Sequence, residues 1–460
     1  MKKLIAIILT FCTLVLCVSC TDANSNANTS SHTQSTHPDA MEELPIDSSI
    51  DDDIKKLSIT EKQEIDGLVA GSGEIVEYDM AVDSNGNFYM VLSTDKDLFK
   101  LVRKTSDGFE VLGEGAVSEF PRYPGDENRT NYAPYKIHIF FDKNDIPYVS
   151  AIVQESLIIY RYNEAEKKIE EAASHKLYYE EDHIFYVSKR ITFDEAENVY
   201  FQIVYEPVDY EIDGKLYPNP DVSITEIAVF NMSTRTFISD ILENVQIRMA
   251  VWGYSSAEDT VYMGAEKIAV ETETTSDYDS VVELYKLKIS GQTITAEKVM
   301  TIAENLKNSE DFVPHLYYYF GGFIFDNDGR MYISYSSRNI YDIKGRSTSY
   351  LMTIKNGEVI KEIECEKLYF EDKSRPRVYF GSVYQWFYGN QQYFIISYND
   401  IRDYMTFGKS NLATGEVSLI CDLDMPARRE EGFAVVPDGT GGFHCLTSLA
   451  EGGYMYFRIS

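Results

Sequence analysis

The segment DSNGNFYMVL, from Asp83 to Leu92, decides the fold of this chain. Residues that tolerate a positive φ form its first half, and an alternating, aromatic-rich run follows, as in a β-hairpin that enters its second strand. The same phrase recurs at Phe140 (FFDKNDIPYVSAIV), Ile191 and Phe323. Weaker copies begin at Ser256, Phe387 and Val435. Copies at intervals of roughly 50 to 70 residues predict a repeat architecture.

Each repeat carries strand-like runs and no helical pattern. In the fifth repeat these runs are Tyr319 to Phe325, Met331 to Tyr335, Tyr350 to Ile354 and Val359 to Ile363. Units of this kind bury their faces by stacking around an axis, so we expect an all-β, seven-bladed β-propeller with four-stranded antiparallel blades. The last repeat has only three such runs before the C-terminus. We expect an N-terminal strand within Ile54 to Ile65 to complete it, which would leave no open sheet edge.

The spacing Asp-x-x-Gly-x-x-Tyr, seen in Asp83-Gly86-Tyr89 and Asp326-Gly329-Tyr332, resembles that of NHL-type and related bacterial lipoprotein propellers. The resemblance implies the propeller fold and names no activity, because it rests on a short hairpin signature. Most copies place an aromatic residue after the turn, and we expect these residues to pack between blades rather than to form a sugar-binding stripe. They are Tyr89, Tyr148, Tyr200, Tyr262, Tyr332, Tyr393 and Phe443.

Residues 1–19 have the pattern of a secretory signal, with Lys2 and Lys3 before an apolar stretch. The residues from Leu16 to Cys20 resemble the lipobox of bacterial lipoproteins. The resemblance implies cleavage before Cys20, attachment of acyl chains such as palmitate to that residue, and a place on the extracytoplasmic face of a bacterial cell envelope. Residues 20–53 then form the lipidated cysteine and an acidic tether without Lys or Arg, which we expect to be disordered, and residues 54–460 form one propeller domain.

The chain is strongly acidic, with a formal net charge of -32. Such a charge argues against nucleic acid and against anionic lipid surfaces as partners. Cleavage before Cys20 leaves Cys365, Cys421 and Cys445 besides the lipidated residue. Three cysteines cannot form a disulfide framework, so we expect buried thiols, with one bridge between Cys421 and Cys445 as the alternative.

Motifs that would identify catalysis are weak in this sequence. The run from Asp326 to Gly329 lacks the acidic closing ligand of a calcium loop, so we interpret it as a hairpin turn. No Gly-x-Ser-x-Gly elbow is present. Five histidines lie in different repeats of the folded part, and their spacing demands no metal site. They are His138, His175, His183, His315 and His444. We therefore predict no catalytic residue, no metal and no cofactor.

Loop length differs between the two ends of the predicted blades. The connections from the second to the third strand, and from each blade to the next, are long and emerge on one face, so this face is the expected working surface. Basic residues gather at the start of the inner strands on that face and favour an anionic ligand such as a carboxylate, phosphate or acidic glycan. The candidate ligand-binding residues are Lys136, Lys189, Arg190, Arg248, Arg375, Arg377 and Arg428, with the aromatic Tyr379 and Trp386. The alternative is that the arginines pair with loop acids and that the aromatic residues pack the loops together.

These observations favour a surface-tethered binding or interaction protein that holds a peptide, glycan or protein on its long-loop face. The enzyme alternative is a propeller lyase or hydrolase that acts on an anionic sugar or lactone, with His138, His183 or His315 near the central channel. A third hypothesis is an accessory subunit that scaffolds an envelope complex.

Overall fold

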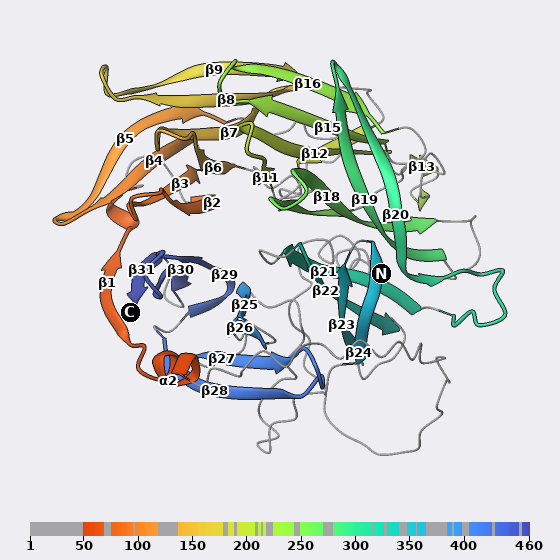
Figure 1. Cartoon of the computed structure of the whole chain (residues 1–460). Coiled ribbons are helices and arrows are strands. Elements are labelled where there is room, and N and C mark those ends of the chain that lie inside the picture. The colour runs from red at the N-terminus through yellow and green to blue at the C-terminus, as the bar shows by residue number, and fades with distance from the viewer. Residues whose placement is uncertain are drawn as a thin grey trace.

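The computed structural model forms a ring of seven antiparallel β-sheets, shown along its axis in Figure 1. The sequence-based prediction of an all-β, seven-bladed propeller is confirmed. The structure describes residues 49–68, 75–94, 97–117, 137–177, 183–187, 191–207, 210–212, 215–217, 224–242, 249–269, 279–314, 316–325, 329–339, 347–355, 357–364, 384–388, 391–397, 404–425, 428–449 and 453–460. No helix in these ranges is both long and apolar enough to cross a membrane.

The first two blades and the fourth to sixth follow one pattern, in which four strands run in chain order from the axis outward. Blade 1 contains β2 (Ile75–Val82), β3 (Phe88–Thr94), β4 (Leu98–Thr105) and β5 (Gly108–Ala116). Blade 2 contains β6 (His138–Phe141), β7 (Pro147–Val153), β8 (Ser156–Asn163) and β9 (Lys168–Lys176). Blade 4 contains β17 (Met249–Ser255), β18 (Thr260–Ala269), β19 (Asp279–Ser290) and β20 (Thr293–Asn305). Blade 5 contains β21 (Leu316–Phe325), β22 (Met331–Asn339), β23 (Ser347–Lys355) and β24 (Glu358–Glu364). Blade 6 contains β25 (Tyr384–Tyr388), β26 (Gln391–Ser397), β27 (Tyr404–Asn411) and β28 (Val417–Asp424).

Blade 3 departs from this pattern at its inner edge. Two short strands, β10 (His183–Val187) and β11 (Thr192–Phe193), both pair with β12 (Asn198–Pro207). The blade continues with β15 (Ile224–Asn231) and β16 (Thr236–Ile241), and a separate hairpin of β13 (Tyr210–Ile212) and β14 (Lys215–Tyr217) lies between β12 and β15 in sequence. The link from β12 to β15, a second-to-third-strand connection that we expected to be long, therefore contains secondary structure of its own.

Blade 7 is completed by the N-terminal part of the domain, as expected. It contains β29 (Arg428–Pro437), β30 (Phe443–Leu449) and β31 (Tyr454–Ile459), and β1 (Ile59–Glu64) pairs with β31 as the fourth strand. The strand is shorter than the predicted segment, because helix α2 (Ser49–Ile54) precedes it. This helix includes Asp51 to Asp53, which we expected in the tether. Its buried Ile54 packs with blades 6 and 7, and burial of this apolar side chain stabilises the acidic helix.

The residues after the turns pack between blades, as predicted for the core. Six tyrosines of the second strands are buried and face the following blade: Tyr89, Tyr148, Tyr200, Tyr262, Tyr332 and Tyr393. In blade 7, Phe443 is buried between blades, as predicted, but it does not face the following blade. Phe443 packs back against blade 6, whereas His444 stacks on Phe88 of blade 1 at 4.4 Å between ring centroids. Successive strand residues point to opposite faces, so His444 takes the place of the tyrosine.

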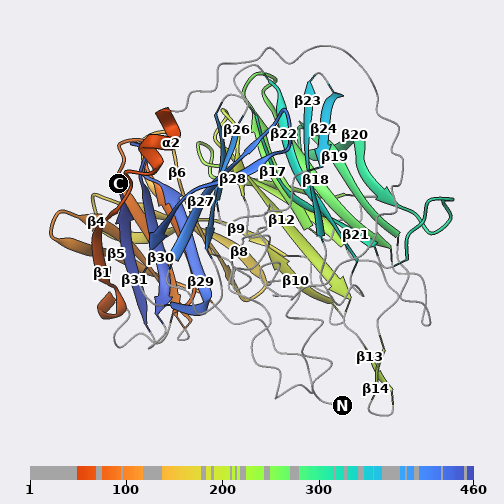
Figure 2. The ribbon, with the colours of Figure 1, turned by 90° about the horizontal axis from the view of Figure 1, so that it is seen from below.

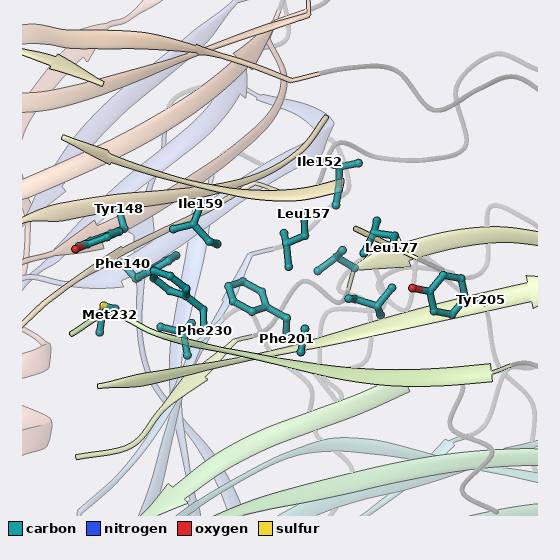
Figure 3. Packing of buried hydrophobic residues seen from close by; sticks show 14 residues of the cluster. Phe140, Tyr148, Ile152, Leu157, Ile159, Leu177, Phe201, Tyr205, Phe230 and Met232 are labelled. Atoms are coloured by element: carbon teal, nitrogen blue, oxygen red, sulfur yellow. The ribbon is translucent and has the colours of Figure 1, made fainter. Parts of the chain in front are cut away.

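Large apolar side chains fill the space between neighbouring blades. Figure 3 shows the cluster between blades 2 and 3, in which Phe140 and Tyr148 from blade 2 meet Phe201 and Phe230 from blade 3. Cys445 is fully buried in the cluster that joins blades 6 and 7, and Cys421 packs at its edge. Both are free thiols, so the alternative of a bridge between them is wrong. Cys365 lies outside the described residues.

Candidate functional site

The two faces of the ring are built differently. On the turn face, the connections within each blade are tight, as between β2 and β3 (83–87) or β8 and β9 (164–167). The opposite face, here called the long-connection face, carries the links from the second to the third strand and from blade to blade. Figure 2 shows the β13–β14 hairpin projecting on the side opposite α2. Several strands extend far toward this face: β18 continues to Ala269, β20 to Asn305 and β22 to Asn339.

Aspartate side chains fix the conformation of several turns on the turn face. Asp83 accepts hydrogen bonds from the backbone N–H groups of Asn85 and Asn87 at 3.0 and 2.8 Å. Asp142 and Asp438 accept equivalent bonds from the N–H groups two and four residues further along. An aspartate in this place fixes the turn by substituting for a backbone carbonyl. The repeated Asp of the sequence phrase is therefore a structural group.

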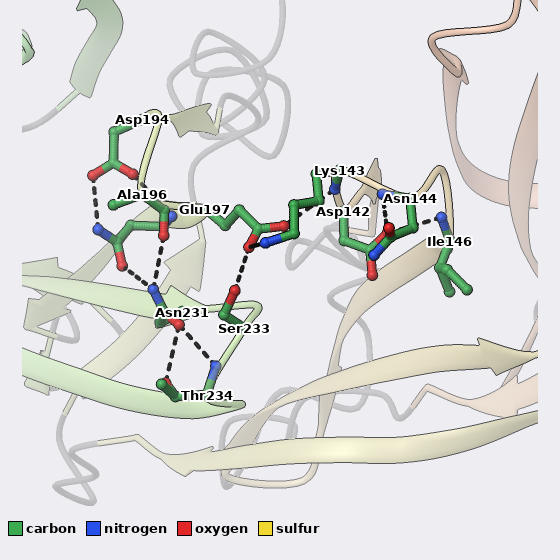
Figure 4. A network of polar contacts seen from close by, with 11 residues as sticks. Asp142, Lys143, Asn144, Ile146, Asp194, Ala196, Glu197, Asn231, Ser233 and Thr234 are labelled. Carbon is green, nitrogen blue, oxygen red and sulfur yellow. Dashed lines mark hydrogen bonds and ion pairs between the residues drawn. The ribbon is translucent and has the colours of Figure 1, made fainter.

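Neighbouring turns are also joined to each other, as Figure 4 shows for blades 2 and 3. Glu197 accepts hydrogen bonds from the backbone N–H and the ammonium of Lys143, and a further bond from the hydroxyl of Ser233. The hydroxyl of Ser233 lowers the pKa of Glu197, with Lys143 adding to this effect against the opposing cost of burial. Asp145 accepts bonds from Ser84 in blade 1 in the same way. The carboxylates of this face thus have protein partners.

Most of the predicted ligand-binding residues lie outside the described residues, so their side chains remain predictions. This group contains Lys136, Lys189, Arg190, Arg248, Arg375, Arg377 and Tyr379, and the predicted lipidation site Cys20 lies outside as well. Arg428 is placed at the first residue of β29, where it pairs with Leu449. Arg428 is thus at the start of an inner strand on the long-connection face, as predicted from the sequence.

Trp386 is the one predicted ligand-binding residue whose packing the structure describes. It lies on β25 and stacks on Tyr393, with ring centroids 5.5 Å apart and planes 18° apart. It also packs against Phe443 of blade 7 at 5.7 Å. These contacts match the alternative in which the aromatic residue packs between blades, and its role in ligand binding stays a prediction.

One connection of the long-connection face is described almost completely, and a buried side chain contributes three of the hydrogen bonds that hold it. Asn305 ends β20, and its amide donates hydrogen bonds to the carbonyls of Val313 and Leu316 at 2.8 and 3.0 Å. Its side-chain oxygen accepts a bond from the N–H of Val313 at 2.9 Å. The Val313 side chain is 44% exposed. The connection therefore presents an apolar group to solvent on a backbone that is fixed by internal hydrogen bonds.

A buried carboxylate lies at the long-connection end of the contact between blades 2 and 3. Glu226 on β15 is 5% exposed, and one of its oxygens lies 2.6 Å from Nε2 of His175 on β9. Its other oxygen accepts a hydrogen bond from the hydroxyl of Tyr205 on β12. Burial acts to raise the pKa of Glu226, but the bonds from His175 and Tyr205 outweigh it, and the pKa is lowered. The carboxylate of Glu226 thus links strands β9, β12 and β15, which belong to blades 2 and 3.

Sequence reasoning did not select this group, although a signal was present. Glu226 interrupts the apolar run ITEIAVF, and Glu283 interrupts VVELY in the same way. Glu283 is also buried, and it accepts hydrogen bonds from the hydroxyl of Tyr285 and from Lys298. A charge inside an apolar strand is costly to bury without a partner, so such residues mark buried polar contacts, between blades for Glu226 and within blade 4 for Glu283.

The histidines of the enzyme alternative do not assemble a centre within the described residues. His138 is buried at the start of β6, with Nδ1 3.7 Å from a carboxylate oxygen of Asp79. His183 lies on β10 without a described side chain, and His315 lies outside the described residues. Among the described residues there is no group of three His, Cys, Asp or Glu side chains that could hold a metal ion.

Comparisons with known proteins support the fold and identify no family. No family model matches the sequence, and no curated protein matches it. Among solved structures, the chain is similar to the polysaccharide lyase Uly1, with a TM-score of 0.51, 7% identity, and coverage of 83% of this chain and 89% of that one. It also matches an oligogalacturonate lyase in complex with manganese (TM-score 0.44, 9% identity, 84% and 89% covered). An ulvan lyase from a new family of polysaccharide lyases matches with a TM-score of 0.43 and 8% identity over 84% and 92% of the two chains. At these identities the likeness shows the propeller fold alone.

Proposed function

We propose that this chain is a lipid-anchored binding protein of the bacterial cell envelope that holds an anionic ligand on its long-connection face. The observation that carries the proposal is the contrast between the two faces. On the turn face, the carboxylates of the repeated phrase are bonded to backbone groups and to neighbouring turns. The other face has tight links at 95–97 and 154–155, against the expectation for second-to-third-strand connections, but others such as 208–223 and 270–278 are longer than folding requires, and surplus loop usually serves binding.

The charge distribution supports an anionic ligand. The chain as a whole is strongly acidic, with 74 acidic and 42 basic residues. Against this background the sequence places seven basic residues of the candidate site near inner strands. Lys136, Arg248 and Arg428 lie at or just before the starts of β6, β17 and β29, whereas Lys189 and Arg190 lie between β10 and β11, and Arg375 and Arg377 lie in the segment before β25. Clustered arginines bind carboxylate and phosphate groups through paired, charge-assisted hydrogen bonds. A polyuronate or an acidic peptide has the chemistry that this face would recognise.

The test is a double variant, Arg248→Ala with Arg377→Ala, assayed by calorimetry against short polyuronate oligomers and an acidic peptide. We expect binding to weaken about tenfold or more, because hydrogen bonds to charged groups contribute about 1.5 to 3 kcal/mol. Arg103→Ala is the matched control, since Arg103 pairs with Glu110 on the outer strands of blade 1. Binding that is equal in the double variant and in the control would remove the proposal.

A second candidate is a lyase that acts on an anionic polysaccharide. It is supported by the likeness in fold to the polysaccharide lyase Uly1 and by the same basic residues, which would neutralise a uronate carboxylate. In such a reaction a base removes the proton beside the carboxylate, the neighbouring C–O bond breaks, and the leaving oxygen takes up a proton. The product contains a new conjugated C=C bond. Incubation with polyuronates, followed at the ultraviolet absorption of that bond, separates the two candidates, because a pure binding protein gives no signal.

A further inference from the structure

The turn between β2 and β3 contains an asparagine that is followed directly by a glycine. Asn85 and Gly86 lie in the middle of this turn, and both are exposed. Gly86 has a φ of 82°, and a Cβ added to it would lie 3.9 Å from the carbonyl oxygen of Asp438, an ordinary contact distance. Because glycine has no side chain, the backbone nitrogen of Gly86 is open to an approaching group. These features favour reaction of the Asn85 amide with the backbone that follows it.

This reaction consumes only water and needs no catalyst. The backbone nitrogen of Gly86 attacks Cγ of Asn85, so that an N–Cγ bond forms and the Cγ–Nδ2 bond breaks. Ammonia leaves with the proton that the backbone nitrogen gives up. Water then opens the cyclic imide at either of its carbonyl groups. One opening gives aspartate, and the other gives isoaspartate, in which the main chain continues through the former side chain.

Two hydrogen bonds restrain the reacting groups in the folded protein. Nδ2 of Asn85 donates to a carboxylate oxygen of Asp145 in blade 2 at 2.6 Å. The N–H of Gly86 donates to the carbonyl of Asp83 at 3.1 Å. The Asn85 amide must leave Asp145, and the Gly86 nitrogen must leave Asp83, before the new bond can form. The rate therefore depends on how often this turn opens locally.

The equivalent turn of blade 2, drawn in Figure 4, provides a comparison within the same molecule. The N–H of Asn144 donates to the side chain of Asp142 at 2.9 Å, as that of Asn85 does to Asp83 at 3.0 Å. The next N–H donates to the carbonyl of the first turn residue at 2.9 Å, compared with 3.1 Å in blade 1. Both asparagines are exposed. The residue after Asn144 is Asp145, however, and its side chain hinders an approach to its backbone nitrogen.

We infer that Asn85 is a site of spontaneous modification to aspartate or isoaspartate, and that its hydrogen bond to Asp145 sets the rate. Asn144 stays unmodified over the same time. This inference does not rest on the proposed function, because the turn lies on the face opposite the proposed binding surface.

The modification weakens the link between blades 1 and 2. Its product carries a carboxylate where the amide of Asn85 donated to Asp145, so two like charges replace a hydrogen bond. Ser84 keeps its own bonds to Asp145, from its N–H at 2.9 Å and from its hydroxyl at 2.6 Å. The link is thus weakened rather than lost. Salt should reduce the repulsion, because the turn is exposed.

The experiment incubates the folded full-length protein in mildly alkaline buffer and follows both asparagines by peptide mass spectrometry. An isoaspartyl methyltransferase identifies the isoaspartate product. We expect conversion at Asn85 and none at Asn144 in the same sample. Equal conversion at the two positions would overturn the assignment. An Asn85 that stays intact while the same residue converts fully in protein unfolded by urea would overturn it too.

Two variants test whether the hydrogen bond to Asp145 sets the rate. Asp145→Ala removes the acceptor, and conversion at Asn85 should become at least about twofold faster, as for the loss of one weak hydrogen bond. Ser84→Ala is the matched control, because it removes another bond to the same carboxylate and leaves the Asn85 amide bound. An unchanged rate in Asp145→Ala, or equal acceleration in both variants, would overturn this part of the inference.

The variant Asn85→Asp reproduces one product and tests its effect on the link. We expect its melting temperature to lie below that of the parent in low salt, and the difference to shrink in high salt. A melting temperature equal to that of the parent in low salt would contradict the predicted weakening of the link.

Discussion

The turn face and the long-connection face of this propeller use their polar residues for different purposes. On the turn face, Asp83, Asp142 and Asp438 bind backbone N–H groups, and Glu197 joins two blades. On the long-connection face, the buried Glu226 stabilises the contact between blades, and this is the face on which the sequence predicts the basic candidate residues. The turn face therefore uses its carboxylates in folding, and the long-connection face is the one that we propose for an anionic ligand.

This contrast predicts where substitutions act. Changes on the turn face should lower stability without a direct effect on binding. Changes of exposed residues on the other face should alter binding without lowering stability. Four substitutions test the stability side of the comparison, in order of decreasing effect.

Asp438→Ala should give the largest loss. The side chain is 2% exposed and accepts hydrogen bonds from the N–H groups of Thr440 and Gly442 and from Arg458. A buried donor that loses its acceptor costs about 1 to 3 kcal/mol, and this applies to the backbone N–H groups of the turn, whereas the Arg458 side chain is 38% exposed and can be hydrated. Denaturant unfolding measures this loss. Asp145→Ala, in an exposed turn, is the control and should cost far less. Similar losses in the two variants would contradict the role given to Asp438.

His444→Phe should change the dependence of stability on pH. Burial of the ring, with the nearby charge of Arg458 adding to it, lowers the pKa of His444 to about 4. Below pH 6.5 the unfolded chain binds a proton that the folded chain refuses, so stability falls as pH decreases from 6.5 to about 4. The full loss is about 3 kcal/mol, since one pKa unit corresponds to 1.36 kcal/mol.

The phenylalanine variant keeps the aromatic contact with Phe88 but loses the 2.8 Å bond between Nδ1 and the hydroxyl of Tyr456. It should be slightly less stable at pH 7 and show a flatter curve between pH 6.5 and 4. The carboxylate of Asp438 has a pKa lowered to about 2, so its contribution disappears only below pH 3.8. Glu197 and Glu226 lose theirs below pH 4.5, in the parent and the variant alike, so the difference between the two curves reports His444. An unchanged slope in the variant would show that His444 is not the group that titrates.

Glu197→Gly should have a smaller effect, because two terms oppose each other. Glu197 has a φ of 63°, a conformation that costs a residue other than glycine about 1 kcal/mol, and glycine relieves this strain. The same change removes the bonds from Lys143 and Ser233. We expect a net loss of about 1 kcal/mol in thermal unfolding. A stabilised Glu197→Gly protein would mean that backbone strain outweighs the links between turns.

Val313→Ser should have the smallest effect on stability, below about 0.5 kcal/mol, because the side chain is largely exposed and Asn305 holds the backbone. The comparison would be sharpened if this variant altered ligand affinity with its melting temperature unchanged. Asn305→Ala is the paired variant, and it should destabilise the connection. A large loss of stability in Val313→Ser would show that this connection serves the fold rather than binding.

The sequence predicted the repeat well because its signal is local. The turn from Asp83 and the tyrosine at position 89 lie six residues apart, and their contacts follow from hairpin geometry. Blade closure by the N-terminal strand was also predictable, since a three-stranded last repeat leaves an open edge. Helix α2 was missed, because its stability depends on contacts with Lys409 and Tyr393, which lie more than 300 residues away.

The site was less accessible to sequence reasoning, for a physical reason. Glu226, His175 and Tyr205 come from three strands of two blades, and their proximity depends on how the blades stack. A charge inside an apolar strand signals that a partner exists but not which residue it is. The prediction of a basic cluster is limited in the same way, because whether these residues converge depends on the ring and on the course of the long connections.

The most direct measurement compares ligand affinity and melting temperature in one set of proteins: the parent, Arg248→Ala with Arg377→Ala, and Arg103→Ala. We predict that the double variant binds polyuronate or acidic peptide about tenfold more weakly at an unchanged melting temperature, while Arg103→Ala binds like the parent. Equal affinity in all three proteins would contradict the claim that the long-connection face binds an anionic ligand.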